Sequence, residues 1–142
     1  MEGIRIGYLP TRRDVFSASE ARRYRGIIKE KISALGAKLI DIDDINDEGL
    51  FFSEQDLPAV LEKMRRSHVD GLFFPHCNFG TEDLVAKTAK ELGKPVLLWG
   101  PRDDAPLADG LRTRDTQCGL FATGKVLRRF NIPFTYIENS RI

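Results

Sequence analysis

The chain has 142 residues, of which 42% are hydrophobic and 30% charged, a size and composition that fit one domain with its own core. Its 22 basic and 21 acidic side chains leave a net charge of +1, so electrostatics give no basis for a nucleic-acid partner or an anionic membrane surface. No apolar run approaches the roughly 20 residues of a membrane span, and the first ten residues lack the regions of a signal peptide. We therefore expect neither nucleic-acid nor membrane contact.

Cysteine content and the absence of internal divisions indicate the compartment and the domain count. Two cysteines, Cys77 and Cys118, are too few for a disulfide scaffold, so a cytoplasmic location is the expectation. Basic clusters at 21–25 and 125–130 have helical spacing and are typical of solvated helix faces. No repeat, low-complexity tract or linker-like stretch divides the chain, so one domain over residues 1–142 is expected.

The first predicted elements are a strand over residues 4–9 and a helix over 18–35. Ser17 or Ser19 could cap that helix, and Gly36 is well placed to end it. The period of 3.6 residues puts five apolar residues on one face of the helix, Ala21, Tyr24, Ile28, Ile32 and Leu35.

A second strand is predicted over 38–42, followed by an irregular acidic stretch and a helix over 54–67. Pro58 falls in the first turn of this helix, where proline is tolerated because the first amides of a helix lack partners. The apolar face of the helix is Leu57, Val60, Leu61 and Met64.

A third strand over 70–74 precedes a helix over 82–93, with Thr81 as its expected N-cap. The remaining predicted elements are a strand over 95–100, a helix over 116–130 and a strand over 133–137. Strands that alternate with helices, and that are continuously apolar, indicate a parallel sheet covered on both faces. The predicted fold is α/β, a flavodoxin-like doubly wound five-stranded parallel sheet with helices on both faces.

Ligands of open parallel sheets bind outside the carboxyl ends of the strands. Three of the four connections at that edge, 10–17, 75–80 and 100–116, hold most of the chemically capable side chains, whereas the connections at the opposite edge are brief and bland. The last connection is also long, as functional loops often are. We therefore expect one edge of the sheet to be a working surface.

Several site classes are absent from this edge. The first loop has neither the G-x-G-x-x-G fingerprint nor the Walker pattern of nucleotide sites, and it lacks the Ser/Thr/Gly-rich phosphate loop of flavin-binding flavodoxins. A phosphorelay receiver would need an Asp where the third strand ends in Pro75-His76, and a phosphatase would need an Arg soon after Cys77. No tip carries carboxylates and His at metal-ligand spacing. His76 and Cys77 are adjacent, but the chain has only two histidines and two cysteines, which gives little support to a zinc site.

Each unusual residue at the edge also has a plain structural interpretation. Arg12 and Arg13 are either exposed loop charges or contacts to an oxygen-rich ligand or a facing subunit. His76 could be a strand-end histidine satisfied by backbone, and Cys77 is better explained as a small buried residue than as a nucleophile, because no base at defined spacing supports the latter. Asn78 could simply form a turn.

Trp99, at the end of the fourth predicted strand, and residues 115–117, at the start of the last predicted helix, also have structural explanations. Trp99 is expected in the core, with its indole edge reaching the rim. A capping role at the helix start explains one residue among Asp115, Thr116 and Gln117. It does not also explain Gln117 and Arg114, the residue before Asp115.

Taken together, three motifs resemble the N-terminal domain of the L-fucose/L-arabinose isomerase family, especially its fucose-isomerase-like members. They are "IGYLPTRRDVFS", "LFFPHCNFGTEDLVAK" and "PVLLWGPRDDAPLADGLRTRDTQCGLFAT", and the resemblance extends over essentially the whole chain. It implies part of an aldose–ketose isomerase that uses a divalent metal, typically Mn²⁺, while a carboxylate moves the proton.

The resemblance also implies that the catalytic and metal-binding residues lie in later domains. This chain would then have no catalytic residue and no cofactor of its own, with Mn²⁺ expected in the full-length enzyme. It would form the rim of a monosaccharide site between subunits of a homo-oligomer. The candidate substrate-binding residues are Arg12, Arg13, His76, Cys77, Asn78, Phe79, Trp99, Arg102, Asp115, Thr116 and Gln117.

Three hypotheses follow for function. The first is the rim and oligomerisation domain of a sugar isomerase, inactive alone. The second is a stand-alone sugar- or metabolite-binding module of the same fold. The third is an interaction domain whose polar rim, including Arg102 and Arg114, is a subunit interface. The identity of the sugar depends on contacts outside this chain.

Overall fold

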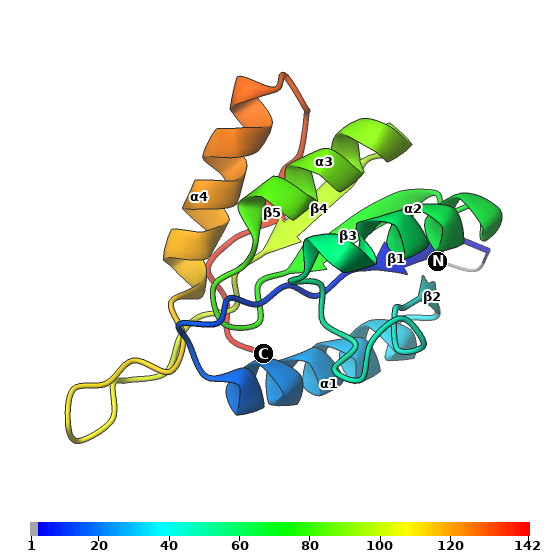
Figure 1. Cartoon of the computed structure of the whole chain (residues 1–142). Coiled ribbons are helices and arrows are strands. Elements are labelled where there is room, and N and C mark those ends of the chain that lie inside the picture. The colour runs from blue at the N-terminus through cyan, green and yellow to red at the C-terminus, as the bar shows by residue number, and fades with distance from the viewer. Residues whose placement is uncertain (1–2) are drawn as a thin grey trace.

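The computed structural model describes residues 3–142, in which strands and helices alternate (Figure 1). The strands are β1 (Arg5–Tyr8), β2 (Lys38–Ile40), β3 (Gly71–Pro75), β4 (Val96–Trp99) and β5 (Thr135–Ile137). The helices are α1 (Ala18–Ala34), α2 (Leu57–Arg66), α3 (Glu82–Leu92) and α4 (Thr116–Arg129), with a 3-10 turn, η1 (Glu54–Asp56), before α2. Every element predicted from the sequence is present, with bounds that differ by at most three residues.

The five strands form one parallel sheet in the order β2-β1-β3-β4-β5. This is the flavodoxin-like order of a doubly wound sheet, so the predicted fold is confirmed. Its topological switch point lies between β1 and β3, where the connections leave toward opposite sides of the sheet.

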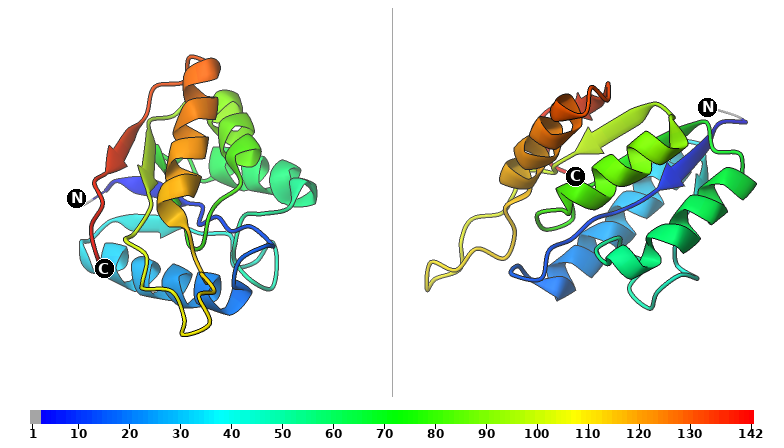
Figure 2. Two further views of the ribbon diagram at one scale, coloured as in Figure 1. Left: turned by 90° about the vertical axis from the view of Figure 1, so that its left-hand side faces the viewer. Right: turned by 45° about the horizontal axis from the view of Figure 1, so that its top comes forward.

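Helices cover both faces of the sheet, with α1 on one side and α2, α3 and α4 on the other (Figure 2). In β3, Leu72 and Phe74 pack toward the three helices, whereas Phe73 packs toward α1. This alternation explains why the strand is continuously apolar, because each face of the sheet has its own core.

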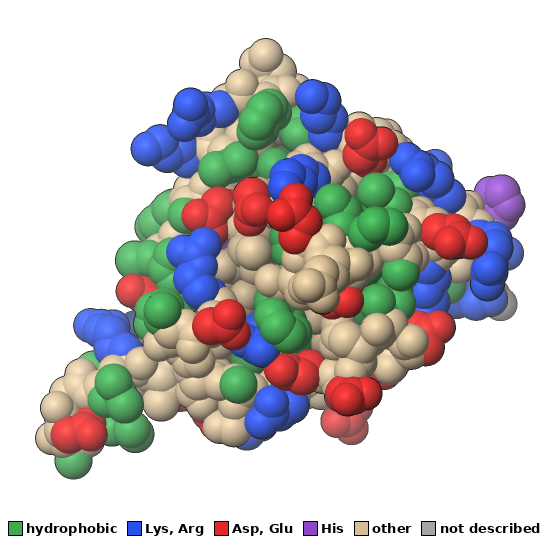
Figure 3. Space-filling view, viewed as in Figure 1, with side chains coloured by type: hydrophobic (Ala, Val, Ile, Leu, Met, Phe, Trp, Pro, Cys, Tyr) green, Lys and Arg blue, Asp and Glu red, His purple; other side chains and the backbone are tan. Residues whose placement is uncertain are grey.

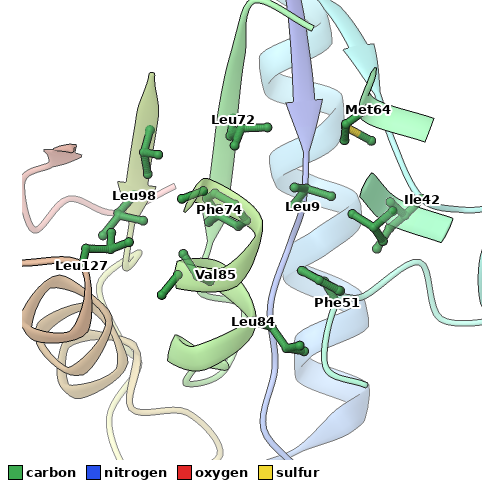
Figure 4. Close-up of a cluster of buried hydrophobic side chains, with 14 of the residues drawn as sticks. Leu9, Ile42, Phe51, Met64, Leu72, Phe74, Leu84, Val85, Leu98 and Leu127 are labelled. Carbon is green, nitrogen blue, oxygen red and sulfur yellow. The ribbon is translucent and has the colours of Figure 1, made fainter. Parts of the chain in front are cut away.

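The larger core lies under α2, α3 and α4, and Figure 4 shows how it is filled. Leu9, directly after β1, and Phe74 of β3 meet Leu84 and Val85 from α3, and Phe51 closes the cluster from the loop after β2. All five side chains are at most 1% exposed. Burial of a side chain of this size contributes about 1.5–3 kcal/mol, so this cluster stabilises the fold.

The capping signals of α1 are confirmed, but one member of its apolar face is not. The Ser17 hydroxyl accepts a hydrogen bond from the Glu20 amide at 3.2 Å, and Gly36 follows the helix with φ +80°. Leu35 was predicted to be buried and is 60% exposed. The reason is that the last helical residue is Ala34, so Leu35 is already a cap and is turned away from the sheet.

The second helix and the cap of the third also differ from prediction. The α-helix α2 starts at Leu57 because Glu54–Asp56 forms a 3-10 turn, and Pro58 lies in the first turn of α2. Thr81 occupies the N-cap position of α3, but its hydroxyl donates instead to the Arg12 carbonyl at 2.8 Å. Among residues 3–142, no helix has both the length and the apolar character needed to cross a membrane.

Candidate functional site

The loops that follow β1, β2, β3 and β4 meet at one edge of the molecule, which we call the carboxyl edge. Thr11 continues the line of β1 and bridges to Phe51 on one side and to His76 on the other. Its amide donates to the Pro75 carbonyl at 2.8 Å, and its carbonyl accepts from the Cys77 amide at 2.9 Å. Backbone pairing therefore continues beyond the strands and fixes three of the loops to one another.

The Asn78 side chain holds the loop after β1 in place through hydrogen bonds to its backbone. Its Oδ1 accepts hydrogen bonds from the amides of Arg13 (2.8 Å) and Phe79 (2.6 Å), while its Nδ2 donates to the carbonyls of Arg13 (3.1 Å) and Ser17 (3.3 Å). The side chain is 0% exposed. Its hydrogen-bonding capacity is used within the chain, so Asn78 positions the loops and does not reach the surface.

His76 is also buried, with 0% of the residue exposed. Its Nε2 lies 2.8 Å from the Thr123 hydroxyl, and its amide donates to the Trp99 carbonyl at 2.7 Å. Burial lowers the pKa of His76 to about 4, so the ring is neutral at pH 7. Gly80, at φ +127°, packs against the ring so closely that a Cβ there would lie 2.3 Å from His76 Cδ2. His76 therefore acts as a packing element between β3 and α4.

Cys77 faces the α1 side of the core and is 0% exposed. Its Sγ lies 3.8 Å from the Pro75 carbonyl oxygen. Burial raises the pKa of the thiol to about 12, so it stays protonated at physiological pH. This agrees with the interpretation of Cys77 as a small buried residue.

The Arg12 guanidinium is held in an internal network and is only 6% exposed as a residue. Nε and Nη2 donate to the two carboxylate oxygens of Glu48 at 2.9 and 2.8 Å, and Nη1 donates to Asp14 at 2.5 Å. The guanidinium carbon lies 3.6 Å from the centre of the Phe52 ring. Burial alone would lower the pKa of Arg12, but the hydrogen bonds to Glu48 and Asp14 outweigh it and raise the pKa. Arg12 is therefore a positioning residue that joins the loops after β1 and β2.

Arg13 and Phe79 lie at the surface of the edge and are half-buried. Arg13 forms an ion pair with Glu82 in the first turn of α3 and lies over the Phe79 ring, 4.5 Å from its centre. The Phe79 ring stacks on Phe16 with centroids 5.5 Å apart and an angle of 8°. The result is a small platform of two rings and one cation that a ligand can touch.

Arg114 organises the loop before α4 from the inside. It is 3% exposed, and it donates to the carbonyls of Cys77 (Nε, 3.0 Å) and Pro101 (Nη2, 3.2 Å). Its guanidinium carbon lies 3.3 Å from the centre of the Tyr24 ring in α1. Arg114 is therefore buried within one chain and is not available to the subunit interface that the third hypothesis assigned to it.

The start of α4 is capped by a residue that the sequence did not indicate. Asp115 occupies the N-cap position without a side-chain cap bond, and both carboxylate oxygens of Asp103 instead lie within 3.2 Å of the Thr116 amide. Thr116 is 0% exposed, whereas Asp115 and Gln117 are partly exposed. The Gln117 amide donates to the Gly100 carbonyl at 2.5 Å. No local pattern could have indicated Asp103, which lies 13 residues before the amide that it caps.

Trp99 and Arg102 have opposite environments. Trp99 is 8% exposed and packs in the core beside α1, as predicted, and its Nε1 has no hydrogen-bond partner within residues 3–142. Arg102 is exposed, and its backbone amide donates to the Ser140 carbonyl at 2.9 Å. Among the predicted site residues, those that keep exposed area are Arg13, Phe79, Arg102, Asp115 and Gln117.

Two further observations complete the geometry. Gly119 of α4 lies directly against the loop after β3, since a Cβ there would be 1.7 Å from the Phe79 carbonyl oxygen. Within residues 3–142, no three His, Cys, Asp or Glu side chains are grouped so that they could hold a metal ion. The described residues therefore do not fit a metal centre.

The sheet order and the interlocked loops define a doubly wound α/β domain with a prepared surface at the carboxyl edge. Comparison with protein families matches residues 7–142 to the N-terminal domain of fucose/sulfoquinovose isomerase. The chain belongs to this family, which confirms the resemblance carried by the three sequence motifs.

A search of the curated proteins found no match. A search of the solved structures found an ABC transporter periplasmic solute-binding protein from Actinobacillus succinogenes 130z, with bound D-allose. It shares 14% sequence identity with this chain at a TM-score of 0.41, over 94% of this chain and 38% of that protein. The chain therefore spans 38% of the length of that protein.

Proposed function

We propose that this chain forms the substrate-facing rim of a metal-dependent aldose–ketose isomerase whose metal ligands lie outside it. The observation that carries this proposal is that buried residues support the loops of the carboxyl edge while other residues of the same loops stay exposed. Asn78 and Arg114 use buried hydrogen bonds to fix the loops, while Arg13, Phe79 and Gln117 keep exposed area beside them. A binding surface needs such support, because contact residues act best when their loops are already ordered.

The exposed side chains have the chemistry that a sugar requires. The Arg13 guanidinium and the partly exposed Gln117 side chain suit hydroxyl oxygens, and the Phe79 platform suits the apolar face of a sugar ring. In the full-length enzyme a divalent metal, Mn²⁺ by family expectation, would polarise adjacent sugar oxygens. The role of this chain is to bind and orient a monosaccharide at a site completed by another subunit of a homo-oligomer.

The first test uses the full-length enzyme that carries this domain. Arg13→Ala and Gln117→Ala are each expected to lower kcat/KM for the aldose by about tenfold or more, since each removes a hydrogen bond to the sugar. Arg66→Ala, on the exposed side of α2, is the matched control and should leave kcat/KM unchanged. Full activity in both rim variants would contradict the proposal.

The second test uses residues 1–142 alone, with Mn²⁺ and L-fucose or L-arabinose. No ketose should form, and ketose production would show that the chemistry resides in this chain. Titration calorimetry with the same sugars separates the rim from a stand-alone module. Binding by the isolated chain that disappears in Gln117→Ala would favour the stand-alone binding module instead.

A further inference from the structure

Residues 105–112 form an exposed arm that projects from the body at the start of α4 (Figures 1 and 2). The arm has a defined turn, in which the Gly110 amide donates to the Leu107 carbonyl at 2.8 Å and the Leu107 amide donates to the Leu111 carbonyl at 3.0 Å. Leu107 and Leu111 are 52% and 60% exposed. Figure 3 shows hydrophobic and acidic side chains together on this projection. The ordered turn therefore holds two leucines in solvent, where another molecule can contact them.

A groove on the flank of α4 has the complementary character. It lies between α4 and the edge strand β5, has a volume of about 580 Å³, and includes Phe121 and Tyr136, which are 71% and 56% exposed. Its cationic rim is Lys125, Arg128 and Arg129, none of which forms an ion pair within the described residues. An apolar floor with unpaired cations suits an apolar segment that presents an acid. The tip of the arm is such a segment, because Asp109 lies between its two leucines, whereas the one basic residue of 105–112, Arg112, is the last residue of the arm.

We propose that the groove of one copy of this chain receives the arm of a second copy, and that the exchange is reciprocal. Figures 1 and 2 show that the arm and α4 leave their junction in opposite directions. Two copies placed antiparallel about a two-fold axis near that junction would each lay an arm along the α4 of the other. Such an interface uses the same surfaces on both copies and therefore closes as a dimer.

The direction of the arm also matches the distribution of charge. In the antiparallel arrangement, the tip of the arm lies farthest from the junction, beside the C-terminal half of the neighbouring α4. Asp109 at the tip then meets Arg128 and Arg129, which belong to the last turn of that helix. This interface uses the flank of α4 and the projecting arm of the loop after β4, and none of the candidate substrate-binding residues belongs to it.

The apolar part of the proposal is tested by sedimentation equilibrium of residues 1–142. The wild-type chain should be dimeric at high concentration. The double variant Leu107→Ser/Leu111→Ser should raise the dissociation constant by at least about tenfold, because each leucine loses its apolar burial. Leu35→Ser, at an equally exposed leucine beyond α1, is the control and should not change the dissociation constant. A wild-type chain that stays monomeric at every concentration overturns the proposal.

Charge reversal tests which residues meet. Asp109→Arg and Arg128→Glu should each weaken the dimer, because each brings like charges together across the interface. An equimolar mixture of the two variants should form a heterodimer, since both arm–groove contacts then join opposite charges. Arg66→Glu, at an exposed arginine of α2, should leave the dimer unchanged. Variants that weaken the dimer but fail to associate when mixed would overturn the pairing of Asp109 with the basic end of α4.

Discussion

The Nε of Arg114 donates a hydrogen bond to the carbonyl oxygen of Cys77 at 3.0 Å, which joins the loop before α4 to the loop after β3. The same guanidinium lies over the Tyr24 ring of α1, 3.3 Å from its centre. One buried cation therefore links three segments that are far apart in the sequence. The order of the carboxyl edge depends on this link and on the clamp formed by Asn78.

Replacing Arg114 by Met should lower the free energy of unfolding by about 2–4 kcal/mol. The change leaves the buried carbonyls of Cys77 and Pro101 without their donors and removes the contact with Tyr24. Urea denaturation followed by circular dichroism measures the effect. Arg112→Met, two residues away and exposed, is the control and should cost less than about 0.5 kcal/mol. Equal effects of the two variants would show that the buried contacts of Arg114 do not stabilise the fold.

The second prediction concerns Asn78. Asn78→Ala should lower the free energy of unfolding by about 2–4 kcal/mol, because it leaves the buried amides and carbonyls of two loops unpaired. The same urea titration applies, with the exposed Asn139→Ala as the matched control. A loss as small as that of the control would mean that water replaces the side chain at no cost.

The third prediction concerns pH. The pKa of His76 is about 4 in the folded chain, whereas 6.5 is its ordinary value, so the unfolded chain binds more protons between these two pH values. The contribution of His76 is therefore fully present above pH 6.5 and is lost as the pH falls toward 4, by about 3 kcal/mol in total.

Unfolding free energies measured across that range, for the wild type and for His76→Gln, provide the test. The wild type should lose stability more steeply as the pH falls, by about 1.4 kcal/mol per pH unit for one proton. His68→Asn, at an exposed histidine, is the matched substitution for comparison. Identical slopes in the wild type and His76→Gln would mean that His76 becomes charged without unfolding.

The fourth prediction concerns the thiols. Cys118 is exposed, whereas Cys77 is 0% exposed and its pKa is about 12. A disulfide reagent at neutral pH should therefore modify one thiol per native chain quickly and the second only on unfolding. Cys118→Ser should abolish the rapid phase. Rapid modification of two thiols in the native chain would contradict the buried position of Cys77.

The predicted elements agree with the structure because apolar periodicity depends on neighbours along the chain. Ser17 caps α1 and Gly36 follows it, as their local pattern indicated. Leu35 differs because the period does not say where the last turn of a helix ends. The observed strand ends also differ from the predicted ones, because pairing with a neighbouring strand decides where a strand ends.

The candidate site was harder to predict, because orientation depends on partners that are distant in sequence. Asn78 has the composition of a sugar contact, but it bonds to Arg13 and Ser17, 65 and 61 residues away. Arg12 is likewise taken up by Glu48, 36 residues away. The topology predicted that these loops meet at one edge of the sheet, and the structure shows that they do. It could not separate the residues that build the edge from those that remain free to touch a ligand.

The contact between Gly119 and the Phe79 carbonyl leaves no space between α4 and the loop after β3. A displacement of the helix is therefore passed to Phe79 directly, since no compressible side chain lies between them. If a neighbouring copy shifts α4 by occupying its outer flank, the aromatic platform at the carboxyl edge must follow. Assembly and sugar affinity would then be thermodynamically linked, each changing the equilibrium constant of the other by the same factor.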